Sequence, residues 1–230
     1  MTQAIPVLVS ARLNSARLAR KCLLDLGGIS VISHIIKRCF HFGLEPVLCC
    51  PKEDVQELML EVSCPVFGMT TDNCEELVIA AANNIGVSVF HHIDGDDPFF
   101  DRDSVIESMQ CFMRGKFSRI RPSVYSQSGC GMVGTSYNLK APSDSGIGIL
   151  PDPATAVWPL RLTLDYPEDY HLILAVNRIL GGYMTPWKAV EDLFIRNPDL
   201  HKINWFRNSE WKARQNDEKH SQPVRDGVLQ

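Results

Sequence analysis

The 230-residue chain lacks the features that mark several large classes of protein. It has no apolar run of the roughly 18 residues that a membrane-spanning helix needs. Its first residues lack the basic and apolar regions of a secretory signal, so we expect a cytoplasmic protein. Its formal net charge of -4 provides no basic excess, and we therefore expect no nucleic-acid partner.

The eight cysteines include no C-x-x-C pair, so we expect no zinc site. Several fall at predicted buried positions, where a reduced thiol behaves as a small apolar side chain. Reduced cysteines also fit a cytoplasmic location. With 45% hydrophobic and 22% charged residues, the composition is that of a globular chain whose core needs no disulfide or metal.

In the first half of the chain, short apolar β-branched runs alternate with segments of helical periodicity. The expected strands are 4–10, 46–50, 64–67 and 87–93, and the expected helices are 29–42, 55–62, 73–85 and a fourth starting at Ser104, with Glu107 completing its capping box. This alternation predicts an α/β fold with a mostly parallel sheet and helices on both faces.

Between 118 and 160 the periodicity is lost, and glycine, serine and proline become frequent. We expect an insertion of short strands and loops within a single domain of residues 1–211, which a polar tail of residues 212–230 follows. The insertion carries apolar residues, namely Val133, Tyr137, Ile147, Leu150, Val157 and Trp158. These side chains are expected in a homodimer interface that overhangs the substrate; packing on the chain's own sheet and a long surface excursion are the alternatives.

Regular structure returns with an expected strand at 161–165, a helix from Pro167 and a helix after Pro186. Other features have ordinary interpretations. His91 and His92 alternate across a strand and cannot share one metal site, so we expect structural or surface roles. The four tryptophans are expected to be core or interface anchors: Trp158, Trp187, Trp205 and Trp211.

A basic loop, ARLNSARLARK at 11–21, directly follows the first strand. Ligands of open parallel sheets bind beyond the carboxyl ends of the strands. In a folded loop, Arg12, Arg17 and Lys21 could converge on a triphosphate. The loop is neither a Walker A loop nor a G-x-G-x-x-G fingerprint, and a solvated basic loop is the alternative.

Two acidic segments are expected at the same edge of the sheet. The first is DGDDP at 94–98, which offers Mg²⁺ the oxygen ligands that it prefers; an ordinary acidic turn is the alternative. The second is Asp165, for which a helix N-cap is the alternative. The basic loop and two acidic strand ends together favour a nucleotide with a divalent metal.

Three motifs resemble those of a known family. ARLNSARLARK resembles the A-R-x-G-S-x-R-L-P-x-K signature of the cytidylyltransferases that activate acidic sugars, which include the CMP-sialic acid and CMP-KDO synthetases. GDDP resembles the family's G-D-x-P, and LTLDYPEDYHLI resembles its D-x-P-E-D-L segment. The spore coat polysaccharide (SpsF-like) branch is the most similar. The resemblance covers roughly residues 4–114 and 159–180.

The resemblance implies a nucleotide-diphosphosugar-transferase (Rossmann-like) fold and the transfer of CMP from CTP to an acidic sugar, with release of pyrophosphate, in surface polysaccharide or glycan biosynthesis. It places these residues around the triphosphate: Arg12, Asn14, Ser15, Arg17 and Lys21. It makes Lys21, Arg12 and Arg17 catalytic, because they would neutralise the leaving pyrophosphate. It assigns Mg²⁺ to Asp96 and Asp165, and leaves open whether Asp94 or Asp97 serves as a base or a supporting partner.

The sequence departs from the family pattern at three places. Asn14, which tolerates left-handed geometry, replaces the loop glycine. Ala19 and Arg20 replace a proline and a small residue, and the segment DNCEEL at 72–77 lacks an arginine common in the SpsF-like branch. Two rival functions therefore stay open: a nucleotide-sugar enzyme of other nucleotide specificity or a glycosyltransferase, and a nucleotide-binding subunit without catalysis.

Overall fold

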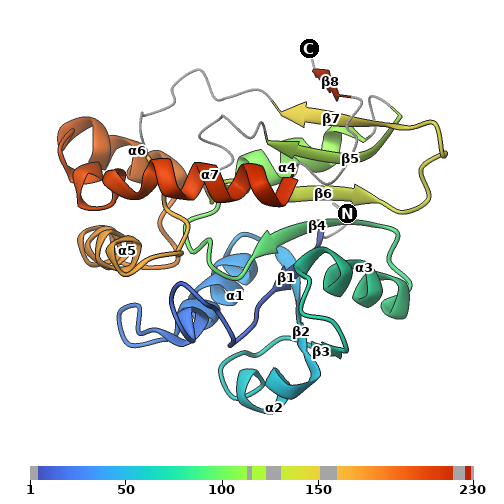
Figure 1. The fold of residues 1–230 in the computed structure, drawn as a ribbon, viewed down its shortest axis with the longest axis horizontal. Helices are drawn as coiled ribbons and strands as arrows, with labels where there is room; N and C mark the ends of the chain where they lie inside the picture. Colours follow the sequence, from blue (N-terminus) through green and yellow to red (C-terminus); the bar gives the residue numbers. More distant parts are fainter. Residues whose placement is uncertain (1–4, 113–115, 123–130, 151–159, 220–225, 229–230) are drawn as a thin grey trace.

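The computed structural model describes residues 5–112, 116–122, 131–150, 160–219 and 226–228, and its strands form one eight-stranded sheet (Figure 1). The order across the sheet is β3-β2-β1-β4-β6-β5-β7-β8. The strands are β1 (Ile5–Ser10), β2 (Leu44–Pro51), β3 (Val66–Met69), β4 (Val89–Asp94), β5 (Phe117–Pro122), β6 (Thr135–Asn138), β7 (Gly146–Leu150) and β8 (Asp226–Val228).

Most neighbouring strands are parallel, and the expected fold class is confirmed. The pairs among β1, β2, β3 and β4 are all parallel, as are those of β7 with β5 and β8. Only β6 among the described strands runs antiparallel to both of its neighbours. Parallel pairing brings the carboxyl ends of β1 and β4 to one edge, where this fold class binds its ligands.

Helices cover both faces of the sheet, as Figure 1 shows for α1 and α3 on either side of β1. The helices are α1 (Val31–His41), α2 (Val55–Leu58), α3 (Cys74–Ile85), α4 (Arg102–Cys111), α5 (Pro167–Leu180), α6 (Trp187–Arg196) and α7 (Asn208–Lys219), with short 3-10 helices η1 (Lys21–Leu23), η2 (Lys52–Asp54), η4 (Leu200–Ile203) and η5 (Trp205–Arg207). None of the described helices is long and apolar enough to cross a membrane.

The side chains of β1 alternate between the two faces of the sheet, so this strand contributes to the hydrophobic core on each face. Val7 and Val9 are fully buried in the large core that includes α1 and α5. Leu8, between them, points to the opposite face and packs in a second core with α3. Because successive residues of a strand face opposite sides, an all-apolar strand such as β1 requires a helix layer on each face.

Two local expectations are wrong. Helix α4 begins at Arg102, and its N-cap is Asp101, whose carboxylate accepts from the backbone N–H of Ser104 at 3.0 Å; Ser104 is therefore inside the helix and forms no capping box with Glu107. Residues 161–165 form no strand. They are buried, but their backbone bonds to other partners: Leu164 N–H donates to Asp96 O at 2.9 Å, and Asn204 donates to Arg161 O at 2.9 Å.

The described part of 118–160 completes the sheet and is no surface excursion. It contributes β5, β6 and β7. Val133 and Leu150 are buried in a small core of this region, and Tyr137 is stacked on Phe90 of β4. These side chains therefore pack within their own chain and need no second copy to cover them. Val157 and Trp158 lie outside the described residues.

Helix α7 carries Trp211, which is buried, and continues to Lys219, past the expected domain boundary at 211. A buried ion pair ties this C-terminal region together, because the guanidinium of Arg161 donates to both carboxylate oxygens of Asp169 at 2.9 and 2.6 Å. Asp169 in turn accepts from the backbone N–H groups of Asp165 and Tyr166, so that it caps α5.

Candidate active site

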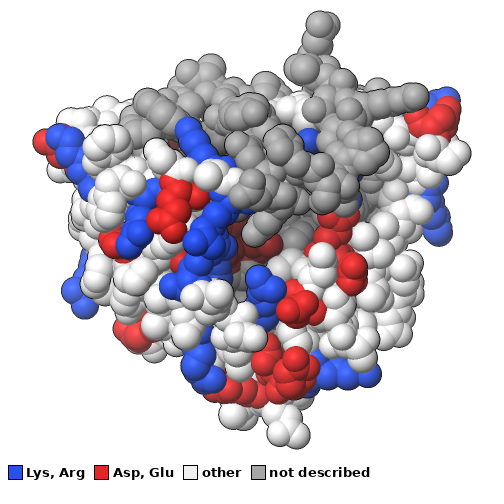
Figure 2. Space-filling view, viewed as in Figure 1, with Lys and Arg blue, Asp and Glu red and all other residues white. Residues whose placement is uncertain are grey.

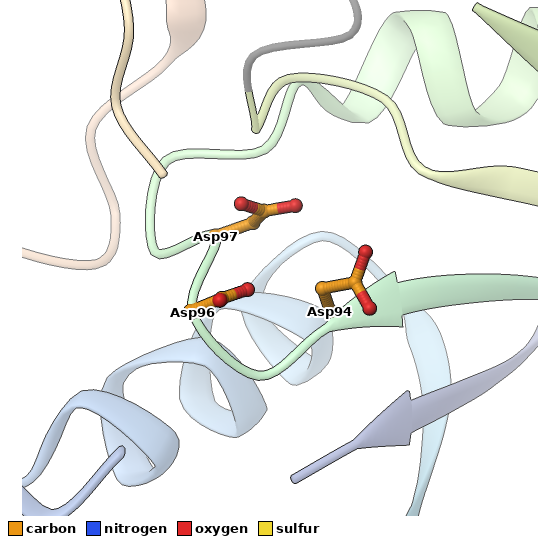
Figure 3. A group of neighbouring side chains, drawn as sticks. All are labelled: Asp94, Asp96 and Asp97. Carbon is orange, nitrogen blue, oxygen red and sulfur yellow. The ribbon is translucent and has the colours of Figure 1, made fainter. Parts of the chain in front are cut away.

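The candidate site lies where β1 and β4 end. In the parallel register Ser10 is paired with Asp94, so the loop after β1 and the turn after β4 start side by side. Gly95 fits tightly here, because a Cβ on this residue would meet Ser10 O at 2.5 Å. Figure 3 shows Asp94 at the end of β4 and Asp96 and Asp97 on the turn that follows. The predicted basic loop and acidic turn therefore meet.

Lys21 is the centre of the site. Its Nζ donates to Asp165 Oδ1 at 2.9 Å and to Asp96 Oδ2. Arg17 also reaches the Asp165 carboxylate, with NH2 at 2.8 Å from Oδ1. Burial lowers the pKa of Lys21, but the two carboxylates outweigh it and the pKa is raised, so the ammonium stays charged. Four of the predicted site residues are thus in one ion-pair network.

Asp165 is no N-cap. Its carboxylate faces the site, where it also accepts from Trp211 Nε1 at 2.9 Å, while Asp169 does the capping. Burial tends to raise the pKa of Asp165, but Lys21 and Arg17 reverse this and hold the pKa below its ordinary value. The carboxylate is therefore ionised and bonded by Lys21, Arg17 and Trp211.

Asp94, Asp96 and Asp97 form a compact acidic group, with one oxygen of each within 4.8 Å of the others. Burial raises the pKa of Asp96 to about 6, opposed by Lys21 and reinforced by Asp165 and Asp94. Burial also raises the pKa of Asp97, and the charges of Asp96 and Asp94 add to this effect. Such repulsion is relieved when a cation binds.

The acidic group fits a divalent cation. Asp97 Oδ1 is buried and has no hydrogen-bond partner among the residues that the structure describes. A buried unpartnered oxygen beside two more carboxylates supplies the hard ligands that Mg²⁺ takes. Asp165, the second predicted metal ligand, is joined to this group through Lys21, which contacts both Asp165 and Asp96.

The remaining predicted phosphate-binding residues are more dispersed. Arg12 points toward α3, where its NH1 donates to Asp72 O at 3.2 Å and lies 3.8 Å from the carboxylate of Asp72. Asn14 is exposed and Ser15 is half-buried on the same loop. The structure therefore brings Arg17 and Lys21 together with the acidic residues, but not Arg12.

The loop closes differently from the expectation for Asn14. Its left-handed residue is Arg20, with φ 53° and ψ 30°. Arg20 N–H donates to Leu13 O at 3.1 Å, and Leu13 N–H donates to the carboxylate of Asp54 at 2.9 Å. The Arg20 side chain pairs with Glu57, away from Lys21. The turn closes without a glycine because Arg20, the residue before Lys21, takes the left-handed conformation.

Sequence reasoning missed three contributors. Trp211, predicted as a core or interface anchor, donates to Asp165. His92, predicted as structural or surface, is buried beside Ser10 and Asp94. Arg161, in the RLTLD segment, anchors Asp169. For His92, the sequence did contain a signal. His92 and Asp94 lie two residues apart on one strand, so their side chains share one face of the sheet.

Basic and acidic side chains cluster together on one part of the surface. On the face that Figure 2 shows, lysine and arginine side chains of the described residues gather near the centre with acidic side chains beside them. A mixed cluster of this kind suits a small phosphorylated ligand together with a cation.

Comparison with known proteins gives consistent matches. A family model described as cytidylyltransferase matches residues 6–120, half of the 230 residues. A 3-deoxy-manno-octulosonate cytidylyltransferase of Rickettsia conorii is 24% identical over 129 residues, which are 53% of this chain and 52% of the relative. The chain thus spans about half the length of the curated relatives it matches.

Two solved structures show the same fold. A cytidylyltransferase from Leptospira borgpetersenii superposes with a TM-score of 0.72 at 17% identity, covering 86% of this chain and 96% of the other. A protein of Mycobacterium tuberculosis, solved in complex with manganese, superposes with a TM-score of 0.52 at 12% identity, covering 76% of this chain and 99% of the other.

Proposed function

Since the chain belongs to the cytidylyltransferase family, we propose that it transfers CMP from CTP to an acidic sugar and releases pyrophosphate, in surface polysaccharide or glycan biosynthesis. The observation that carries the proposal is the network of Lys21 and Arg17 with Asp96 and Asp165 at the carboxyl ends of β1 and β4. The curated relatives, which are named for CMP transfer to an acidic sugar, support the choice of acceptor.

In this proposal the basic side chains hold the charge of the leaving group. Lys21, Arg17 and Arg12 would neutralise the pyrophosphate as the bond to the α-phosphate breaks, and catalysis of this kind depends on positioning and charge. Asn14 and Ser15 would line the same triphosphate pocket. Lys21 would exchange its carboxylate partners for phosphate oxygens when the nucleotide enters.

We propose Mg²⁺ as the cofactor, held by Asp96 and Asp165, with Asp94 and Asp97 in reach of the first. A divalent cation supplies Lewis acidity and lowers the pKa of an attacking oxygen. The buried unpartnered Asp97 Oδ1 supports the assignment, and so does the manganese complex of one structural neighbour. Asp94 and Asp97 remain the two candidates for a base or for a supporting partner of the cation site.

Pyrophosphate release tests the reaction. Purified protein is incubated with Mg²⁺, one of CTP, UTP, GTP or ATP, and a panel of ulosonic and nonulosonic acids. The proposal expects release only with CTP and at least one acidic sugar. Release with another nucleotide would favour the rival specificity, and CTP binding without release would favour the non-catalytic subunit.

We also propose a cytoplasmic homodimer. The described cysteines are all free, which fits a reducing compartment. Val133, Tyr137 and Leu150, which the sequence predicted in the dimer interface, are buried within the chain and do not support the dimer. It is supported instead by exposed apolar side chains such as Trp205 and Phe206. Sedimentation equilibrium at micromolar concentration tests it, and a species of 25.8 kDa would contradict it.

A further inference from the structure

A buried histidine is linked to the acidic group through one hydroxyl. His92 Nε2 lies 2.8 Å from Ser10 Oγ and 3.5 Å from Asp94 Oδ1. The Ser10 hydroxyl donates to the same Asp94 oxygen at 3.3 Å. Ser10 is 2% exposed and His92 is 7% exposed, whereas the Asp94 side chain is 49% exposed. The chain of contacts therefore runs from the core to the edge of the site.

The strand register places these residues side by side. In the parallel pair of β1 and β4, Leu8 is paired with His92 and Ser10 with Asp94. Because side chains alternate, these four residues share the face of the sheet that α3 covers. Ser10 is thus the residue of β1 that stands beside both His92 and Asp94.

The hydrogen-bonding groups of this link are consistent with one another. A hydroxyl has one hydrogen to donate and two lone pairs that accept. The Ser10 hydroxyl lies within hydrogen-bond distance of both groups: it donates to the Asp94 carboxylate at 3.3 Å and bonds His92 Nε2 at 2.8 Å. The thiol of Cys74, at the start of α3, bonds to the same hydroxyl. Burial lowers the pKa of His92, although Asp94 and Glu75 oppose it, and this favours the neutral ring.

We propose that His92, acting through Ser10, is a positioning residue that holds the Asp94 carboxylate in the acidic group and so sets the affinity of this group for a divalent cation. The inference rests on the part of the proposed function that places a cation at this turn. Neither His92 nor Ser10 touches the nucleotide or the cation in this scheme. Their effect passes through the orientation of one carboxylate, as the groups behind metal ligands commonly act.

The neighbouring histidine gives a matched contrast. His91 is buried on the opposite face of β4, where its Nδ1 lies 2.8 Å from Ser136 Oγ. Ser136 is also fully buried, and its hydroxyl is 2.7 Å from Ser108 Oγ. Strand β4 thus carries two buried histidines, each bonded to a serine of a neighbouring strand; among the residues that the structure describes, the pair of His92 and Ser10 is linked to an acidic side chain of the site and the pair of His91 and Ser136 is not.

The test compares Ser10→Ala with Ser136→Ala. Each removes one buried hydroxyl that bonds a histidine ring, so both are expected to lower stability in thermal unfolding. The decisive measurement is the Kd for Mn²⁺, the probe ion, obtained from the electron paramagnetic resonance signal of free Mn²⁺ without nucleotide or sugar. We expect Ser10→Ala to weaken Mn²⁺ binding about tenfold and Ser136→Ala to leave it within twofold of wild type.

A second pair covers the case in which Ser10→Ala does not fold. His92→Leu removes the ring nitrogen that bonds Ser10, whereas His92→Gln keeps a hydrogen-bonding side-chain amide at a similar distance from the backbone. The proposal expects weaker Mn²⁺ binding for His92→Leu and recovery to within about threefold for His92→Gln.

The outcomes separate this inference from the proposed function. Wild-type Mn²⁺ affinity in Ser10→Ala and His92→Leu, or an equal loss in Ser136→Ala, overturns it. A wild-type protein that binds no Mn²⁺ overturns both the inference and the cation of the proposed function. A clear difference in Mn²⁺ affinity without any pyrophosphate release supports the inference and contradicts only the proposed reaction.

Discussion

Lys21 Nζ bonds Asp165 Oδ1 at 2.9 Å and also bonds Asp96, so one ammonium group lies between the two carboxylates that we expect to hold the cation. The ammonium and a divalent cation are alternative partners for these oxygens. Entry of a metal-bound nucleotide would therefore release Lys21 toward the phosphates. The same side chain would neutralise the carboxylates before the nucleotide binds and the phosphates afterwards.

Replacing Lys21 tests this double role. Lys21→Ala should reduce kcat for pyrophosphate release by roughly 10²–10³, the usual effect of losing one charge-stabilising contact. The same variant should bind Mn²⁺ more tightly without nucleotide, because the competing ammonium is gone. Arg20→Ala is the control, since Arg20 lies in the same loop but pairs with Glu57. Turnover of Lys21→Ala within threefold of wild type would contradict the catalytic assignment.

Asparagine substitutions separate a metal-binding carboxylate from a helix cap. Asp165→Asn and Asp96→Asn should each abolish Mg²⁺-dependent turnover and leave metal-free nucleotide binding nearly unchanged. Asp101→Asn is the matched control, because Asp101 is the N-cap of α4 and asparagine caps about as well as aspartate. Activity and urea unfolding are measured for all three. A fully active Asp165→Asn protein would remove Asp165 from the site.

The guanidinium of Arg38 is fully buried, and its hydrogen bonds go to backbone carbonyl groups. It donates to Phe100 O at 3.0 and 2.8 Å, to Tyr183 O at 2.9 Å and to Thr185 O at 2.6 Å. Burial lowers its pKa to about 10, so it is charged at neutral pH.

Arg38→Met should therefore lower the free energy of unfolding by about 3 kcal/mol, because three carbonyl groups, two of them in buried hydrogen bonds, lose a charged donor. Urea denaturation measures the change, and Lys37→Met on the exposed side of α1 is the control. A loss below about 1 kcal/mol would show that water or other groups replace the guanidinium.

Protonation of His34 should make the protein less stable in acid. Burial, and then the charge of Arg38, lowers the pKa of His34 to about 3 from an ordinary value of 6.5. Between these values the unfolded chain binds the proton and the folded chain does not. The free energy of unfolding therefore falls as the pH drops below about 6.5, by about 1.4 kcal/mol per pH unit for this group.

His34→Leu should remove that part of the slope. Urea unfolding of the variant and of wild type at pH 5.5 and 4.5 gives the comparison, and the difference between the two slopes is independent of any constant effect of the substitution. His171→Leu, on the exposed side of α5, is the control. Equal slopes for His34→Leu and wild type would contradict the prediction.

The sequence predicts those parts of the fold that depend on residues close together in the chain. The alternation of residues 4–94 predicts the parallel strands, and the basic loop and acidic turn follow from strand ends. The segment 161–165 alternates polar residues with leucines but forms no strand, because its backbone groups bond to the acidic turn and to the side chain of Asn204.

Contacts that depend on distant docking could not be predicted. Trp211 reaches Asp165 only because α7 packs against the segment before α5, and no pattern near either residue indicates this. The position of Arg12 likewise depends on Asp72, which belongs to another loop. The motif places Arg12 beside Lys21, whereas tertiary contacts separate them.

The donation of Trp211 to Asp165 has a consequence for folding of the nascent chain. Ser10 and Lys21 leave the ribosome early, but the site also needs Asp165 and the indole of α7, close to the other end of the sequence. Contacts of such long sequence separation form late, because the entropy of closing the intervening loop must be overcome first. Catalytic competence should therefore appear only after α7 is synthesised, and nascent chains that end before Asp165 would carry Lys21 and the acidic turn without the second carboxylate of the site.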